Sequence, residues 1–150
     1  MLVQPANVLD ITTLNQLEKI CFPQDAWPLI DLVSCLTFPG VLRFKAVEDG
    51  RMIGFVAADD RTAAHAAWIA TLCVHPDFQR KGFARQLLDE VESQVKSPYI
   101  RLCVRPNNTA AIHLYEERGY VQIDTWKNYY NDGSDAIVME KMITDPQAEL

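Results

Sequence analysis

A segment that combines a glycine with several basic residues is the first place where this sequence suggests chemistry. Residues 74–84 read Val-His-Pro-Asp-Phe-Gln-Arg-Lys-Gly-Phe-Ala, and an amphipathic pattern follows directly. Backbone N–H groups at the start of a helix, together with the helix dipole, form a binding site for anions. Gly82 lets the backbone approach a phosphate closely, while Arg80, Lys81 and Arg85 add positive charge. The segment predicts a pyrophosphate-binding loop, with a capped helix and three solvated cations as the alternative.

Two common nucleotide-binding motifs are absent from this segment. It lacks the Lys-Ser/Thr ending of a P-loop and the G-x-G-x-x-G of a dinucleotide site. Any phosphate-containing ligand must therefore be bound by another kind of loop.

The cysteines and histidines do not form a metal-binding pattern. The four cysteines stand at 21, 35, 73 and 103, without a C-x-x-C pair or a histidine at ligand spacing. We expect no metal and four free, mostly buried thiols in a reducing compartment, which favours a cytoplasmic location. His75 is expected to be a solvated residue in a turn, and His113 does not share a helix face with Tyr115.

The composition is that of one globular domain. The chain has 150 residues, of which 49% are hydrophobic and 23% charged, and its net charge is −6. The acidic balance argues against a nucleic-acid partner, and the apolar runs are too short for a membrane span. We expect a single domain over 1–143 and a polar, frayed tail over 144–150.

Hydrophobic spacing and turn residues predict the elements that must position the loop. Asp49-Gly50 fits a type I′ hairpin turn, Pro39-Gly40 ends a helix, and Asn107-Asn108 can cap the start of another. The expected order is β-α-α-β-β-β-α-β-α-β-β, a mixed sheet with helices packed on it. Strands are expected at 2–4, 41–48, 51–58, 66–74, 99–104, 120–130 and 135–142, and helices from 10 to 21, after 28, after 82 and after 108.

Two of these motifs resemble those of the GNAT N-acetyltransferases. Residues 79–84 match the Q/R-x-x-G-x-G/A loop that binds acetyl-CoA in that family, and residues 107–120 match its N-x-x-A-x-x-L-Y-x-x-x-G-F/Y helix. Residues 128–139 and residues 18–27 are similar to the ribosomal-protein-alanine (RimI-type) subfamily. The similarity spans nearly the whole chain.

The resemblance implies a GNAT fold of the α/β (α+β) class. Such a fold has a mixed, mostly antiparallel sheet of about seven strands and about four helices. The strand before the phosphate loop splays from its neighbour and leaves a V-shaped opening for acetyl-CoA. The cofactor-binding residues implied by the resemblance are Leu72, Cys73, Val74, Gln79, Arg80, Lys81, Gly82, Phe83, Ala84, Asn108 and Tyr115.

Within this set, the resemblance assigns separate tasks. Backbone groups of residues 72–74 would bind the pantetheine and the thioester, and an N–H there would stabilise the oxyanion. Tyr115 matches the family's tyrosine that protonates the leaving CoA thiolate. A phenol suits that step because its pKa of about 10 keeps it protonated at neutral pH.

The general base is where the sequence departs from the subfamily. RimI-type enzymes read L-E-V-R in a strand where this chain reads Leu-Cys-Val-Arg, so Cys103 replaces the glutamate. Three possibilities stay open: Cys103 packs while water carries the proton, Cys103 takes the acetyl group, or another residue is the base. The candidates for such a base are His65, Glu18 and Asp25.

The function implied is acetyl-CoA-dependent N-acetylation by direct attack of an amine in a ternary complex. The subfamily resemblance favours a protein N-terminal α-amine as acceptor, such as that of a ribosomal protein. A small-molecule amine, or a weakly catalytic acyl-CoA-binding module, is the alternative. Trp27, Tyr129 and Tyr130 either line the acceptor groove or act as hydrophobic plugs, and the chain is expected to be a monomer or a homodimer.

Overall fold

The computed structural model describes residues 2–60 and 65–144, and its element order is the one that the sequence predicts. The helices are α1 (Ile11–Cys21), α2 (Leu29–Thr37), α3 (Phe83–Gln94) and α4 (Thr109–Glu117). The strands are β1 (Leu2–Pro5), β2 (Val41–Glu48), β3 (Arg51–Asp59), β4 (Ala66–Val74), β5 (Tyr99–Val104), β6 (Val121–Trp126) and β7 (Ala136–Met142). Short 3₁₀ helices lie at Val8–Asp10 and Pro76–Phe78.

The strands form one sheet in the order β1-β2-β3-β4-β5-β7-β6. Every neighbouring pair is antiparallel except β4 and β5, which run parallel. The predicted mixed, mostly antiparallel sheet is therefore confirmed, and β6 and β7 pair within this chain.

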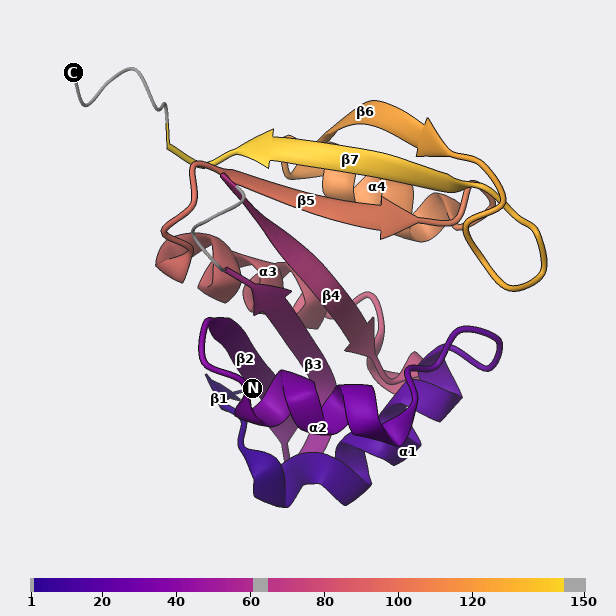
Figure 1. Ribbon diagram of the computed structural model, residues 1–150. Helices are drawn as coiled ribbons and strands as arrows, with labels where there is room; N and C mark the ends of the chain where they lie inside the picture. The colour runs from indigo at the N-terminus through magenta and orange to yellow at the C-terminus, as the bar shows by residue number, and fades with distance from the viewer. Residues whose placement is uncertain (1, 61–64, 145–150) are drawn as a thin grey trace.

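The two parallel strands separate part-way along their length. β4 continues to Val74 and β5 to Val104, yet their pairing ends at Trp68 and Arg101. Figure 1 shows β4 and β5 diverging from this point, with β1 to β4 on one side of the gap and β5 to β7 on the other. This is the splay that the family resemblance predicts.

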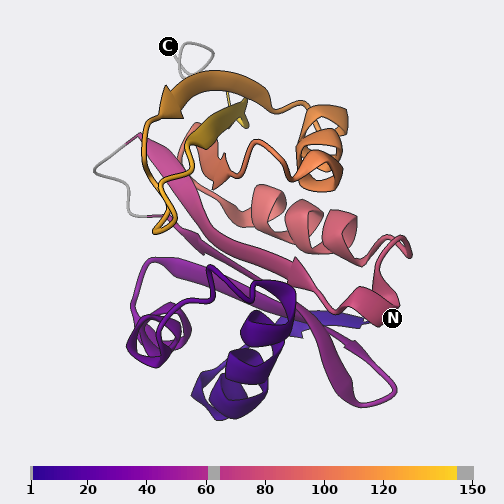
Figure 2. The same cartoon turned by 90° about the vertical axis from the view of Figure 1, so that its right-hand side faces the viewer.

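Helices cover both faces of the sheet, as the turned view shows (Figure 2). On one face α3 and α4 pack over a core that includes Leu87, Leu88 and Ile100. On the other face α1 and α2 enclose a second core, in which Leu14 and Phe55 are fully buried. The amphipathic spacing of the helices explains why each buries only one side.

Local chemistry explains where several elements begin and end. Asp49 and Gly50 have positive φ angles of 51° and 73°, as the predicted type I′ turn requires. Pro5 was expected to stop the first strand but belongs to it, because β1 is an edge strand where a missing N–H costs no ladder bond. The strand expected at 120–130 is shorter, since β6 ends at Trp126.

The limits of the domain stay a prediction. Thr144 N–H donates to the carbonyl oxygen of Pro98, while residues 145–150 of the predicted tail lie outside the described residues. None of the described helices is long and apolar enough to cross a membrane.

Candidate active site

Two adjoining clefts open where β4 and β5 separate. The first, of about 840 Å³, has walls rich in Trp and Tyr and is called the aromatic cleft. The second, of about 660 Å³, is lined by the turn before α3 and is called the loop cleft. The residues lining both clefts are Cys21, Phe22, Leu72, Asn108, Ala111 and Tyr115. The two clefts therefore adjoin at these residues, and the region that they form together is called the passage.

The turn before α3 has a backbone suited to a bound anion. Arg80 and Gly82 have left-handed φ angles of 65° and 86°, so the backbone turns sharply just before α3 begins. Gly82 is the N-cap residue and offers no side-chain cap, so the N–H groups of the first turn keep free donor capacity. A Cβ built on Gly82 would meet no atom within 4 Å, so the space above the turn is open. The residues present therefore fit a pyrophosphate group.

Most of the predicted cofactor-binding residues lie together in the loop cleft. Lys81 is not among the lining residues, and its ammonium group instead lies over the Phe78 ring, 5.3 Å from the centroid. Arg85 lines the cleft but is paired with Glu117 at 2.7 Å. The predicted residues that line the cleft are Leu72, Cys73, Val74, Gln79, Arg80, Gly82, Phe83, Ala84, Asn108 and Tyr115.

The end of β4 presents polar backbone groups to the gap. The carbonyl oxygen of Val74 accepts a bond from Gln79 Nε2 at 3.2 Å and one from Cys21 Sγ at 3.4 Å. Backbone groups of alternate residues in a strand point to the same side, so the N–H and C=O of Leu72 share this direction. Leu72 is thus a residue whose N–H can reach a ligand in the passage.

Tyr115 stands where the two clefts meet. The residue lies on α4, is 7% exposed, and has its ring 5.6 Å from that of Tyr120. Burial, with smaller effects of Tyr130 and Cys73, raises the pKa of Tyr115 well above its usual value. The hydroxyl is therefore a permanent hydrogen-bond donor at physiological pH.

Asn108 has a structural role that the sequence predicted. Its Oδ1 accepts a hydrogen bond of 3.2 Å from the N–H of Ala111 and so caps α4. Because Asn108 also lines both clefts, its amide N–H groups lie within reach of a ligand.

Cys103 lies on β5 and contributes to the wall of the aromatic cleft. Burial raises the pKa of Cys103, and the hydrogen bond with Tyr129 offsets only part of that effect. The thiol is consequently neutral at physiological pH, a state that serves neither a general base nor a thiolate nucleophile.

The three candidate bases are in very different places. Glu18 is fully buried between α1 and β4, where its carboxyl accepts a 2.9 Å hydrogen bond from Thr71. Burial raises the pKa of Glu18 despite bonds that favour its charge, that of Thr71 first. Asp25 lines the aromatic cleft but is held by Arg105 at 2.6 Å. His65 precedes β4 at the opposite end from Leu72, roughly 23 Å away at 3.3 Å per residue, so the structure separates it from the site.

The remaining histidines and the cysteines lie outside any metal group. His75 Nδ1 accepts a bond from the N–H of Asp77, and His113 pairs with Glu117. Of the four free thiols only that of Cys73 is fully buried, so the expectation of mostly buried thiols was too strong. Within residues 2–60 and 65–144, no three His, Cys, Asp or Glu side chains are grouped closely enough to hold a metal ion.

The aromatic cleft is lined by the predicted Trp27, Tyr129 and Tyr130 and by two further tryptophans. Trp27 donates from Nε1 to the carbonyl oxygen of Ala70 at 3.0 Å, which fixes its ring against β4. Trp68 and Trp126 were not predicted, and their rings lie 5.5 Å apart across the two halves of the sheet. For Trp68, the only usable signal was that side chains along a strand alternate between its two faces. For Trp126, no local feature of the sequence predicts a position in the cleft.

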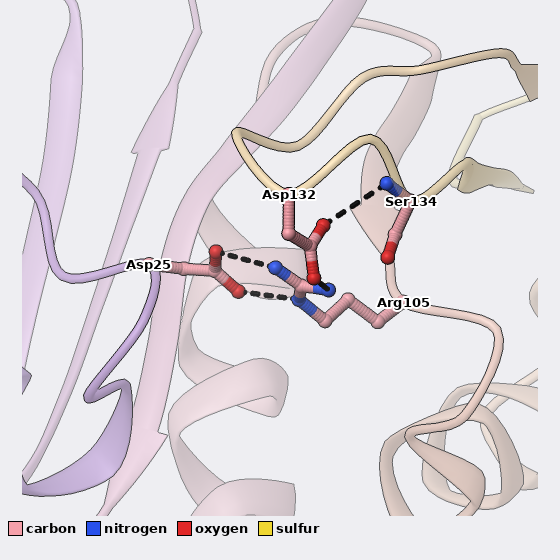
Figure 3. Close-up of polar contacts among 4 residues, drawn as sticks. All are labelled: Asp25, Arg105, Asp132 and Ser134. Atoms are coloured by element: carbon pink, nitrogen blue, oxygen red, sulfur yellow. Dashed lines mark hydrogen bonds and ion pairs between the residues drawn. The ribbon is translucent and has the colours of Figure 1, made fainter.

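Arg105 was also missed as a site residue. It follows β5 directly and connects Asp25 with Asp132, two residues from distant loops (Figure 3). The sequence gives only a weak signal that Arg105 connects two loops, because an arginine that follows a strand is most often solvated.

Comparisons with known proteins agree with this geometry. The chain is 28% identical over 153 residues to NAA10, the catalytic subunit of the N-terminal acetyltransferase A complex of Arabidopsis thaliana, covering 97% of this chain and 79% of the relative. It is 35% identical over 104 residues to the ribosomal protein bS18-alanine N-acetyltransferase of Escherichia coli K12, covering 65% of this chain and 69% of that one. The crystal structure of the ribosomal-protein-S18-alanine N-acetyltransferase from Escherichia coli matches with a TM-score of 0.87 at 26% identity, covering 99% of this chain and 97% of that one.

The family comparison covers the part of the chain that forms the splay. Residues 11–120 match the Acetyltransferase (GNAT) family, a span that contains the turn before α3, the diverging strands and Tyr115. The predicted family and the predicted enzyme class are thereby confirmed. This chain belongs to the GNAT family of acetyltransferases and is an N-acetyltransferase.

Proposed function

We propose that this protein transfers the acetyl group of acetyl-CoA to the N-terminal α-amine of a protein. The observation that carries the proposal is the passage between β4 and β5, in which the loop cleft and the aromatic cleft meet at Leu72 and Tyr115. A thioester approaching from one side and an amine from the other would meet beside a buried hydroxyl. Among the relatives are an N-terminal acetyltransferase subunit and a ribosomal-protein alanine N-acetyltransferase, which supports a protein N-terminus as acceptor.

The loop cleft is the proposed site of CoA. The free N–H groups at the start of α3 and the helix dipole would hold the pyrophosphate, with Arg80 as the charged partner. Lys81 would contribute long-range attraction, since its side chain lies over Phe78. Asn108, from the start of α4, would contact the pantetheine arm.

The chain's own groups would act on the thioester in two places. Acetyl-CoA supplies an acetyl group activated by its thioester bond. The N–H of Leu72 points into the gap and would donate to the thioester oxygen as negative charge develops there. The Tyr115 hydroxyl would donate to the sulfur as that atom leaves, which places the two donors on the two atoms that gain charge.

The acceptor nitrogen must lose a proton, and no strong base is needed for this. An α-amine has a pKa of about 7.7–8, so a substantial fraction is already neutral at physiological pH. We assign Cys103 to the wall of the aromatic cleft and the proton to water in that cleft, because burial keeps the thiol neutral. The free thiols also support a cytoplasmic location for this reaction.

The direct test is CoA release with a panel of acceptors. An alanine-initiated ribosomal peptide is compared with other N-terminal peptides, with a copy blocked at its α-amine, and with small amines. We expect turnover of free N-termini and none of the blocked copy. Tyr115→Phe should lower kcat by about 10²-fold while CoA affinity is retained, and Tyr99→Phe, on β5 outside both clefts, should change neither.

Other outcomes of this test would contradict the proposal in distinct ways. Turnover of small amines alone would replace the acceptor with a small molecule. Tight CoA binding with no turnover of any acceptor would identify an acyl-CoA-binding module. Unchanged kcat in Tyr115→Phe would remove the hydroxyl from the reaction.

A further inference from the structure

Arg105 occupies a junction between the two halves of the molecule. Its Nε and Nη2 donate to the two oxygens of Asp25 at 2.6 and 2.8 Å, and its Nη1 donates to Asp132 at 3.0 Å. Figure 3 shows the guanidinium between these two carboxylates. The Arg105 side chain is only 15% exposed, which makes this contact stronger than an ion pair in open solvent.

The two partners come from loops on opposite sides of the aromatic cleft. Asp25 lies between α1 and α2, next to Phe22 and Trp27, which line the cleft. Asp132 lies between β6 and β7, next to Tyr129 and Tyr130, which line it too. The two loops therefore both contribute walls of the aromatic cleft.

Hydrogen bonds within the loop between β6 and β7 tie its residues to one another. Tyr130 N–H donates to Ser134 at 3.1 Å, Gly133 N–H donates back to Tyr130 at 2.9 Å, and Ser134 N–H donates to the Asp132 carboxylate at 3.0 Å. Hydrogen bonds from Ser134 and then from Arg105 lower the pKa of Asp132 to about 2, so this carboxylate is charged at any assay pH.

The guanidinium has a second contact that involves its face. Arg105 lies over the ring of Tyr130, 4.3 Å from the centroid, and so fixes an aromatic wall of the cleft. A lysine would keep the charge but lose the planar fork and the stacking face. The arrangement thus depends on arginine and not on positive charge alone.

We propose that Arg105 is a positioning residue that holds the Asp25 loop and the Asp132 loop at the separation required by the acceptor chain. The inference rests on the proposed function and adds a determinant of acceptor binding to it. Arg105 does not line the loop cleft, so the effect is confined to the acceptor.

The test compares Arg105→Lys with Arg101→Lys. Arg101 is a matched control because it lies on β5, close to Arg105 in the chain, and also pairs through Nε, with Glu140 at 2.7 Å, while lining neither cleft. We expect Arg105→Lys to raise the acceptor KM by about tenfold and to leave the KM of acetyl-CoA within about twofold. Amide hydrogen exchange of residues 22–28 and 127–135 should be faster in Arg105→Lys than in wild type, and it should be unchanged in Arg101→Lys. Asp132→Asn should move the same quantities in the same direction.

A measurement that needs no turnover separates this inference from the proposed function. Peptide affinity, in the presence of CoA, is followed by the fluorescence of the tryptophans in the aromatic cleft. Wild-type protein that binds peptide without turnover contradicts the proposed function, while the variants still test Arg105. Unchanged exchange in both loops, or faster exchange with unchanged peptide affinity, overturns the positioning role. Wild-type protein that binds no peptide overturns both.

Discussion

At the scale of single residues, burial has opposite consequences for two groups in the same cleft. It raises the pKa of both Tyr115 and Cys103. For the tyrosine this preserves the proton that a donor to a leaving sulfur must carry. For the cysteine it removes the thiolate that a base or nucleophile would need. The same physical effect thus supports the predicted role of Tyr115 and favours packing as the role of Cys103.

The proposed packing role of Cys103 leads to a prediction about pH. Cys103→Ala should keep kcat within about threefold of wild type, and kcat/KM should rise toward the α-amine pKa of about 7.7–8 in both proteins. Initial rates from pH 6 to 9 measure this. Cys35→Ala is the matched control, since Cys35 lies on α2 outside both clefts. A tenfold loss of turnover with normal CoA binding would place the Cys103 thiol in the mechanism.

Glu18 leads to a prediction about stability. Burial raises the pKa of Glu18 in the folded protein above its usual value of 4.5. As pH rises, the unfolded chain therefore loses this proton first, and the free energy of unfolding falls between the pKa of the unfolded chain and the higher pKa of the folded protein. Glu18→Gln removes the titration and keeps an acceptor for Thr71. We expect the Tm difference between the variant and wild type to become more positive from pH 4 to pH 8, with turnover retained.

The control for this experiment is Glu116→Gln, an exposed position on α4. It should show no comparable change of the Tm difference with pH. Turnover lost in Glu18→Gln at unchanged CoA affinity would instead identify Glu18 as the base.

At the scale of elements, the start of α3 depends on one backbone conformation. Gly82 has a φ of 86° and gives the helix no side-chain cap, which leaves donors for an anion. The hairpin turn provides a structural counterpart, since Gly50 has a φ of 73° and equally open space around its Cα. The two glycines share a left-handed backbone conformation, but only Gly82 begins a helix and lines the loop cleft.

This pair allows strain to be separated from binding. Gly82→Ala and Gly50→Ala should each cost about 1 kcal/mol of the free energy of unfolding, from the left-handed φ. Only Gly82→Ala should also weaken CoA binding, by about tenfold or more, because the turn then loses its anion-binding shape. Calorimetry of CoA binding and thermal unfolding measure both quantities. Equal CoA affinity in the two variants would refute the assignment of the loop.

At the scale of the whole molecule, the sheet is open at the place where the ligand is proposed to bind. Past Trp68 and Arg101 the two halves of the sheet share no β4–β5 pairing. The ion pair of Arg105 with Asp25 and the contact between the tilted rings of Trp68 and Trp126 connect the halves instead. A ligand that contacts both β4 and α4 would therefore add to the cohesion of the fold.

This leads to a prediction about thermal stability. Acetyl-CoA at 100 times its Kd should stabilise the folded state by about 2.7 kcal/mol, which is about 5–10 °C in Tm for a chain of this length. Thermal unfolding with and without ligand measures the shift. At the same concentration the shift should be much smaller in Gly82→Ala, and a shift of equal size there would contradict binding at the loop cleft.

The features that the sequence predicted are those that short-range chemistry governs. The Asp49-Gly50 turn, the Asn108 cap and the apolar stripe of α3 each depend on residues within a few positions of one another. The same holds for the turn at 79–82, whose glycine and following helix are adjacent in the chain. Tyr115 was found through a motif of one helix, so its position on α4 followed as well.

The features that only the tertiary structure decided involve residues far apart in the chain. Arg105 and Asp25 are separated by 80 positions, and Arg105 and Asp132 by 27, so no local pattern predicts their contact. Whether Glu18 faced the cleft or the core, and how far His65 lay from the site, depended equally on packing. Helix caps and turns depend on backbone bonds between near neighbours, whereas the width of a cleft and the burial of a charge depend on which surfaces the fold brings together. The sequence alone therefore determined the family, the order of the elements and the glycine turn before α3, and the tertiary structure decided which side chains meet around them.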